Sequence, residues 1–307
     1  MINVLFSARP QLWDTYRDLL IGACEAKGIE INIGTDIPAD QVDYIIFAPN
    51  PKLTDFTQFT RCKAVLSLWA GVESIAPNST LTQPLCRLVD TGLTQGMIEW
   101  VTGHVLRHHL GMDEQIKTQN GNWAPAAPPL SKDRPVTILG LGELGAACAK
   151  ALVQLGFPVT GWSRTPKAIE GIRCLSGSPT EALKDAQIAV LLLPLTAETE
   201  NTLNADALNA MAKGAFVINP GRGALIDDDA LLDALNSGQI AHATLDVFRV
   251  EPLPSDHAYW EHPNVTVTPH IASETRPETA VEQIAENLRR SEAGEPLLNL
   301  VDRSRGY

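Results

Sequence analysis

Residues 136–145 read VTILGLGELG, and this stretch decides the fold. A short apolar run of strand length leads directly into a glycine-rich turn, and a helical pattern of apolar residues follows. In such a turn the first glycine permits a tight bend, the second lets the backbone approach a pyrophosphate, and the third lets helix and strand pack closely. The free N–H groups at the start of the helix favour phosphate. The stretch predicts a dinucleotide-binding unit, with contacts from Gly140, Leu141, Gly142, Glu143, Leu144 and Gly145.

The next expected strand ends in residues of positive rather than negative charge. Residues 162–167 read WSRTPK, where enzymes that use NAD usually carry an acid that binds the ribose hydroxyls. A carboxylate would repel a 2′-phosphate, whereas Arg164 can hold one through paired, charge-assisted hydrogen bonds. A solvated basic loop is the alternative interpretation. The sequence favours NADPH over NADH, with contacts from Ser163, Arg164, Thr165 and Lys167.

Short apolar runs alternate with helical stretches on both sides of this unit. N-terminal to it, strands are expected at 3–7, 44–48, 64–68 and 87–89, and helices at 11–27 and 95–119. The proline-rich stretch NWAPAAPPLSKDRP (122–135) predicts a loop or linker. C-terminal to the turn, helices are expected at 144–155, 207–211, 228–236 and 278–292, and strands at 159–162, 187–193, 215–219, 243–247 and 265–268. This alternation predicts open parallel sheets covered by helices.

Composition limits the classes of function. The 307 residues suffice for two domains, and 44% hydrophobic and 20% charged residues are typical of a globular protein. The net charge of −12 argues against a nucleic-acid partner, which needs a basic face. No run reaches the ~18 apolar residues of a membrane span, the first residues lack the pattern of a signal peptide, and five scattered cysteines fit reduced thiols. A cytoplasmic protein is expected.

Three further segments each follow an expected strand: INPGRGALID (218–227), LDVFRVEPLP (245–254) and VTPHIASETRP (267–277). Because ligands bind at the carboxyl ends of parallel strands, we expect Arg222, Glu251 and His270 to converge. Arg222 can polarise a carbonyl, His270 can protonate the developing alkoxide, and Glu251 would orient His270 and favour its charged form. Each residue alone also fits a structural role. Together they fit reduction of a small 2-oxo acid by hydride transfer.

With these motifs the chain resembles the D-isomer-specific 2-hydroxyacid dehydrogenases, and most closely the branch that reduces glyoxylate and hydroxypyruvate. The resemblance covers nearly the whole chain and includes LSLWAGVESI (66–75), GFPVTGWSRTPK (156–167) and the final VDRSRGY (301–307). It implies an α/β protein with two doubly wound parallel-sheet domains. A Rossmann cofactor domain, residues 97–275, is then inserted in a flavodoxin-like substrate domain formed by residues 1–96 and 276–307.

The resemblance also assigns residues to the site. It implies the catalytic triad Arg222, Glu251 and His270, with the substrate carboxylate also bound by the backbone amides of Ala70, Gly71 and Val72 and with Trp69 as a wall. A cluster of N–H groups around a glycine suits an anion on physical grounds too. The pair Pro220–Gly221 departs from many relatives, which predicts a changed loop shape. Further cofactor contacts are implied for Leu193, Pro194, Thr199, Asn219, Pro220, Gly221, Asp246 and His270.

A homodimer is also implied by the resemblance, with helix 95–119 and the arm after it at the interface. Trp123 is the candidate to reach the partner's active site. His104 and His108 stand four residues apart on this helix, but because no third ligand accompanies them they are interpreted as surface or interface histidines, and no metal is expected.

Two other interpretations remain open. One is an NAD-linked dehydrogenase of the same superfamily that acts on a larger 2-oxo acid. The other is a non-enzymatic dinucleotide sensor that resembles the transcriptional corepressors of this fold. The intact arginine, glutamate and histidine favour an enzyme.

Overall fold

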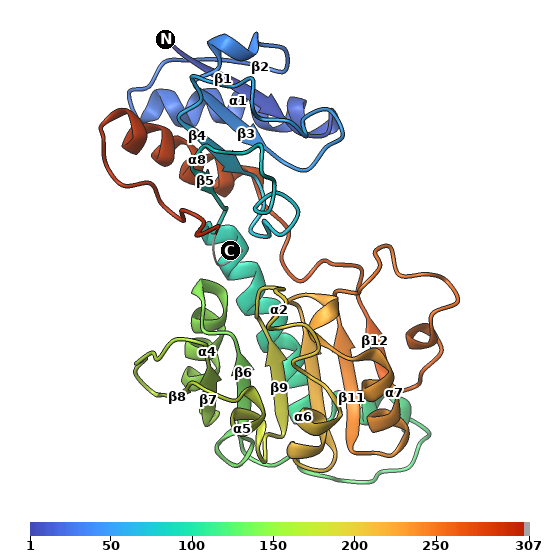
Figure 1. Cartoon of the computed structure of the whole chain (residues 1–307). Coiled ribbons are helices and arrows are strands. Elements are labelled where there is room, and N and C mark those ends of the chain that lie inside the picture. Colours follow the sequence, from blue (N-terminus) through green and yellow to red (C-terminus); the bar gives the residue numbers. More distant parts are fainter. Residues whose placement is uncertain (304–307) are drawn as a thin grey trace. The chain divides into compact units, whose positions relative to one another are not determined.

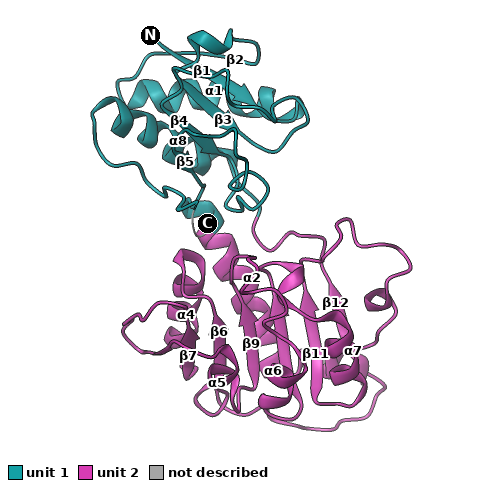
Figure 2. Cartoon of the chain, in the orientation of Figure 1, with its two compact units in different colours: residues 1–93, 274–307 teal, residues 94–273 magenta. Residues whose placement is uncertain are grey.

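The chain forms two compact units, and the computed structural model describes residues 1–303 (Figure 1). The first unit consists of residues 1–93 and the segment from Glu274 onward, and the second is Thr94–Ser273 (Figure 2). The expected class is confirmed: two parallel α/β sheets, with the second unit inserted in the first. The chain divides after Leu93 and after Ser273, whereas the sequence predicts divisions after residues 96 and 275. The last four residues of the VDRSRGY tail lie outside the described residues.

The first unit contains a five-stranded parallel sheet in the order β2-β1-β3-β4-β5, which is the flavodoxin-like order. Helices α1 and α8 pack on each other and on the apolar face of β1, β3 and β4. Strand β2 is missing from the sequence-based prediction, and the strand expected at 87–89 lies two residues earlier. The elements are β1 (Ile2–Ser7), α1 (Gln11–Ala26), β2 (Ile31–Gly34), η1 (Ala39–Gln41), β3 (Tyr44–Phe47), β4 (Ala64–Ser67), β5 (Leu85–Cys86) and α8 (Pro277–Glu292).

The second unit contains a seven-stranded parallel sheet in the order β12-β11-β10-β9-β6-β7-β8, a Rossmann sheet with one added strand. Strand β6, which precedes the glycine turn, lies where the strand order reverses. Its strands are β6 (Val136–Leu139), β7 (Val159–Trp162), β8 (Ile172–Leu175), β9 (Ile188–Leu191), β10 (Ala215–Asn219), β11 (Ile240–Leu245) and β12 (Val265–Val267). Strand β8 is also missing from the sequence-based prediction.

Helices cover both faces of this sheet, as a fully parallel sheet requires. Helices α2 and α4 pack on one face and α5, α6 and α7 on the other, so β6 and β9 are buried throughout. The helices are α2 (Thr91–Leu110), α3 (Met112–Lys117), α4 (Glu143–Gln154), α5 (Pro179–Leu183), α6 (Ala205–Ala210) and α7 (Asp228–Asn236), and the short 3-10 turns are η2 (Ser131–Asp133), η3 (Gly223–Leu225) and η4 (Ala258–Trp260).

The single helix expected over 95–119 is two helices. Gly111 adopts a left-handed conformation with φ of 64°, which ends α2 at Leu110 and begins α3 at Met112. Residues 118–130 then form neither helix nor strand, and all of them are exposed. The arm after the helix is therefore an extended surface segment.

His108 on α2 lies buried inside the second unit, so the expected surface or interface position is wrong. Its ring stacks on Phe216 with centroids 4.7 Å apart, and its Nε2 lies 2.9 Å from the Thr244 hydroxyl. Burial lowers the pKa of His108 to about 3, which keeps the ring neutral. In the described part of the chain no group of three or more His, Cys, Asp or Glu side chains could hold a metal ion.

Two further structural features concern the membrane and cysteine predictions made from the composition. None of the helices within residues 1–303 combines the length and the apolar character that crossing a bilayer requires. All five cysteines are free thiols, and four of them are buried. Burial raises the pKa of Cys24, Cys62, Cys86 and Cys148 to about 11 or 12, so these thiols are protonated and unreactive at neutral pH.

Candidate active site

The turn after β6 needs glycine at two positions for reasons internal to the protein. Gly140 has a φ of 108°, and a Cβ there would lie 2.4 Å from the Leu192 carbonyl oxygen. A Cβ on Gly145 would lie 1.8 Å from the carbonyl oxygen of Gly140, so helix α4 meets the turn backbone to backbone. Gly140 is thus required by its backbone conformation and by packing, and Gly145 by packing.

Gly142 differs from the other two glycines. It caps the N-terminus of α4 in an extended conformation, and a Cβ there would meet no atom of the protein within 4 Å. The protein's own packing therefore does not require glycine at this position. The open space lies at a helix N-terminus, whose N–H groups and dipole favour an anion. A dinucleotide pyrophosphate fits this turn.

The basic loop after β7 is tied to the glycine turn. Lys167 Nζ donates a hydrogen bond of 2.5 Å to the carbonyl oxygen of Leu141, in the middle of that turn. The buried Ser163 hydroxyl donates to the Thr165 carbonyl oxygen at 2.7 Å, which fixes the loop itself. Residues 163–167 therefore lie beside the turn with no acidic side chain among them.

Arg164 has an ion-pair partner that the sequence pattern does not indicate. Its Nη1 lies 3.1 Å from Glu198 Oε2, and both side chains are largely exposed. Glu198 is separated from Arg164 by 34 residues, so only the fold brings the two together. Because the pair is exposed to water and salt, its strength is modest and the guanidinium can exchange partners.

The loop after β9 is closed by its own threonine. Thr199 donates a hydrogen bond from its hydroxyl to the Pro194 carbonyl oxygen at 2.7 Å and accepts one from the Thr196 amide at 2.8 Å. Leu193, which begins the loop, is buried. Thr199 thus shapes the segment from which the cofactor contacts of Leu193 and Pro194 are predicted.

Arg222 is presented by a turn that Asn219 organises. The fully buried Asn219 side chain donates to the Arg222 carbonyl oxygen at 2.9 Å and accepts from the Gly221 amide at 3.1 Å. The Arg222 guanidinium donates to the carbonyl oxygen of Gly221 at 2.7 Å. A Cβ on Gly221 would lie 2.8 Å from the Leu191 carbonyl oxygen, so the Pro220–Gly221 pair lets the turn lie close against the end of β9.

Gly223 is a site residue that sequence reasoning misses. A Cβ on Gly223 would lie 2.0 Å from the carbonyl carbon of Phe248, which belongs to the loop that carries Glu251. Only glycine permits this approach, and it joins the loop of Arg222 to the loop of Glu251. The second glycine of the NPGRG motif is the signal that could have identified it.

Glu251 and His270 meet directly, as predicted. His270 Nδ1 lies 2.8 Å from Glu251 Oε2, and the other carboxylate oxygen accepts a hydrogen bond from the Phe248 amide at 2.9 Å. The His270 side chain is 52% exposed. With Nδ1 engaged by the carboxylate, Nε2 is the nitrogen through which a proton can pass to a bound molecule.

Asp246 shapes the loop that carries His270. Its fully buried carboxylate accepts hydrogen bonds from the Thr268 hydroxyl at 2.5 Å and from the amides of Ile271 and Ala272 at 2.9 and 2.8 Å. His270 itself has a left-handed φ of 54°, and its amide donates to the Asp246 carbonyl oxygen at 2.8 Å. Asp246 thus positions His270 from within the protein, while its contact with the cofactor stays a prediction.

Trp69, Ala70, Gly71 and Val72 lie in the first unit, immediately after β4. The Trp69 side chain is 37% exposed, whereas Val72 is buried. The Ser67 hydroxyl accepts from the Trp69 amide, and the Trp69 carbonyl oxygen accepts from the Leu88 amide, both at 3.0 Å. This loop is therefore anchored to the end of β4 and to the segment that follows β5.

The second unit is built as a nicotinamide-dependent dehydrogenase is, with a glycine turn and a hydrogen-bonded glutamate–histidine pair at the carboxyl edge of one Rossmann sheet. The sequence pattern of the D-isomer specific 2-hydroxyacid dehydrogenase NAD binding domain matches residues 101–272. The chain belongs to this family. It is therefore an NAD(P)-binding oxidoreductase, and the resemblance seen in the sequence is confirmed.

Similar proteins match this chain over most or all of its length. The glyoxylate/hydroxypyruvate reductase A of Serratia proteamaculans is 42% identical over 89% of this chain and 90% of its own length, and that of Yersinia enterocolitica is 42% identical over 80% and 82%. The solved 2-hydroxyacid dehydrogenase of Xanthobacter autotrophicus in complex with NADPH and MES is 40% identical, with a TM-score of 0.91 over 100% of this chain and 99% of its own. An NADPH-dependent glyoxylate/hydroxypyruvate reductase of Sinorhizobium meliloti, solved with NADP and sulfate, is 31% identical, with a TM-score of 0.85 over 100% of both chains.

The glycine turn yields a paired prediction. Gly142→Ala should leave the melting temperature nearly unchanged, because its Cβ meets no protein atom, yet weaken dinucleotide binding about tenfold or more. Gly145→Ala should instead destabilise the second unit by about 1–3 kcal/mol, because its Cβ overlaps the Gly140 carbonyl. Calorimetric unfolding and titration with NADPH separate the two effects. Equal loss of stability in both variants would contradict the assignment of Gly142 to the cofactor.

Proposed function

We propose that the protein is a cytoplasmic reductase that converts a small 2-oxo acid of the glyoxylate or hydroxypyruvate type to the 2-hydroxy acid with NADPH. The hydrogen bond of 2.8 Å between Glu251 and His270, at the strand ends of a dinucleotide-binding unit, is the observation that carries this proposal. The loop of Arg222 supports it, because Gly223 holds that loop against Phe248. Two relatives at 42% identity are named for this activity.

In the proposed mechanism Arg222 binds the substrate carboxylate and carbonyl oxygen and draws electron density toward that oxygen. His270 donates the proton from Nε2 to the carbonyl oxygen, while Glu251 stabilises the charged imidazole through Nδ1. When bound, the nicotinamide would supply the hydride for the carbonyl carbon. In the reverse direction His270 accepts the hydroxyl proton.

The remaining contacts are also proposals. The backbone amides of Ala70, Gly71 and Val72 bind the substrate carboxylate, and Trp69 forms a wall of the substrate site. The dinucleotide is held by the glycine turn 140–145 and by Leu193, Pro194, Thr199, Asn219, Pro220, Gly221, Asp246 and His270.

His270→Ala tests the chemistry. The variant should lower kcat by roughly 10²–10⁴-fold, because a positioned acid–base group contributes about that much, and leave the Kd for NADPH within about threefold of the wild type. NADPH absorbance with a 2-oxo acid gives kcat, and quenching of tryptophan fluorescence gives the Kd. Equal losses in both quantities would make the residue structural.

A panel of 2-oxo acids separates the proposal from its alternatives. Glyoxylate and hydroxypyruvate should be turned over with NADPH at a higher kcat/KM than larger 2-oxo acids. Faster turnover of a larger acid with NADH would favour an NAD-linked dehydrogenase. Tight NADPH binding without turnover of any acid would favour a dinucleotide sensor.

We propose that Ser163, Arg164, Thr165 and Lys167 hold the 2′-phosphate of NADPH. Arg164→Asp should shift the ratio of kcat/KM for NADPH to that for NADH toward NADH by about tenfold or more, because a lost charge-assisted bond costs about 1.5–3 kcal/mol. Arg173→Asp, at an exposed position on neighbouring β8, makes the same change of charge and should leave the ratio unchanged. An unchanged ratio in Arg164→Asp would remove this assignment.

We propose that the protein is a homodimer in which α2, α3 and the arm after them meet a second copy. Four large apolar side chains of this region are 42–93% exposed, which is unusual unless another surface covers them: Met112, Ile116, Trp123 and Leu130. Sedimentation should give twice the mass of the chain. Trp123→Ala should lower kcat in the dimer if the partner's Trp123 reaches the active site, and a monomeric wild type would overturn the proposal.

A further inference from the structure

We infer that Arg249 is a positioning residue for the proposed reaction, which fixes Glu251, and through Glu251 the imidazole of His270, against the loops that follow β9 and β10. The inference rests on the proposed function, because that function assigns Glu251 and His270 to catalysis. Arg249 precedes Glu251 by two residues on the loop after β11.

The Arg249 guanidinium uses all three of its nitrogens on partners from two other loops. On the β9 loop, Nη1 lies 3.2 Å from Glu200 Oε1, and Nη2 donates to the side-chain oxygen of Asn201. On the segment after β10, Nη2 donates to the Ile226 carbonyl oxygen at 2.6 Å, and Nε lies 3.3 Å from Asp228 Oδ2. A planar fork of donors can satisfy such a set of acceptors, whereas a single ammonium cannot.

These partners belong to the loops that present the other site residues. Ile226 directly follows η3, and η3 begins immediately after Arg222. The Asn201 amide donates to the Ala224 carbonyl oxygen at 2.9 Å, so the β9 and β10 loops are joined side by side. Arg249 therefore attaches the Glu251 loop to two loops that are already joined to each other. The β10 loop carries Arg222, and the β9 loop contains the predicted cofactor contacts.

Asp228 is held from its other side by Tyr259. The Tyr259 hydroxyl donates to Asp228 Oδ1 at 2.8 Å. Burial, and then the charge of Asp228, raise the pKa of the Tyr259 phenol, so it remains a donor. The carboxylate that Arg249 grips is thus itself fixed, which makes the anchor rigid.

Arg249 adds a polar anchor to the Glu251 loop, which is otherwise held by the close approach of Phe248 to Gly223 and by the packing of Phe248 and Leu253 on the core. Val250 is 61% exposed, and the Glu251 carboxylate is held within its own loop by the Phe248 amide. Exposed ion pairs contribute little to folding. Placement of an acid–base pair is far more sensitive, since a shift of about 1 Å can lower a rate by roughly 10²-fold.

A double-mutant cycle tests the inference on the full-length enzyme. Arg249→Met should lower kcat by about tenfold or more and change the KM for NADPH by less than about threefold. In a Glu251→Ala background the same change should lower kcat by less than about twofold, because the residue acts through that carboxylate. Should Arg249→Met fail to fold, Glu200→Gln removes the charge of one exposed partner and should give a smaller loss of kcat that again depends on Glu251.

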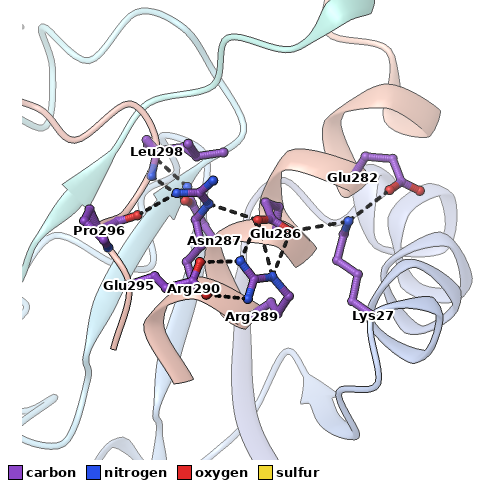
Figure 3. A network of polar contacts seen from close by, with 9 residues as sticks. All are labelled: Lys27, Glu282, Glu286, Asn287, Arg289, Arg290, Glu295, Pro296 and Leu298. Carbon is purple, nitrogen blue, oxygen red and sulfur yellow. Dashed lines mark hydrogen bonds and ion pairs between the residues drawn. The ribbon is translucent and has the colours of Figure 1, made fainter. Parts of the chain in front are cut away.

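Arg289→Met is the matched control. Arg289 is 33% exposed, against 32% for Arg249, and it also binds two carboxylates, Glu286 and Glu295, in the network of α8 (Figure 3). It belongs to the first unit and bears on stability alone, so its kcat should equal that of the wild type.

The outcomes separate two failures. Additive losses in Arg249→Met and Glu251→Ala, or an unchanged kcat in Arg249→Met, would overturn the positioning role. Unchanged kcat in both Glu251→Ala and His270→Ala would instead overturn the proposed function.

Discussion

Close backbone approach at glycine is the constraint on which the site depends. Gly145 meets the carbonyl of Gly140, Gly221 meets that of Leu191, and Gly223 meets the backbone of Phe248. A single methyl group at any of these glycines would block the contact. Because parallel strands end at one edge of the sheet, the loops start near one another, and these approaches let their backbones pack directly together.

Buried polar side chains give the loops their shape once they are in contact. Asn219 satisfies the amide of Gly221 and the carbonyl of Arg222, and Asp246 satisfies the amides of the two residues that follow His270. A buried polar group without partners costs free energy, so these side chains each select one loop conformation. The strained left-handed φ of His270 persists because Asp246 fixes the residues after it.

Positive charge is concentrated locally around the proposed site of this acidic protein. The net charge of −12 is offset locally by Arg164 and Lys167 beside the glycine turn and by Arg222 on the β10 loop. Glu198 and Glu200 pair with arginines of this same unit. The proposed site thus contains a few placed cationic groups rather than a basic surface.

Local sequence patterns determined the order of most strands and helices, the glycine turn and the residue types of the site, because periodicity and turn chemistry act over a few neighbouring residues. They missed β2 and β8, whose four residues are mostly half-exposed or exposed and form no continuous apolar run. Only the tertiary structure decided that His108 is buried, that Asp246 shapes the loop of His270, and that Arg249 binds residues 23 and 49 positions away. Which distant residues become partners depends on the order in which the strands pair side by side in the sheet. No short stretch of sequence encodes that order.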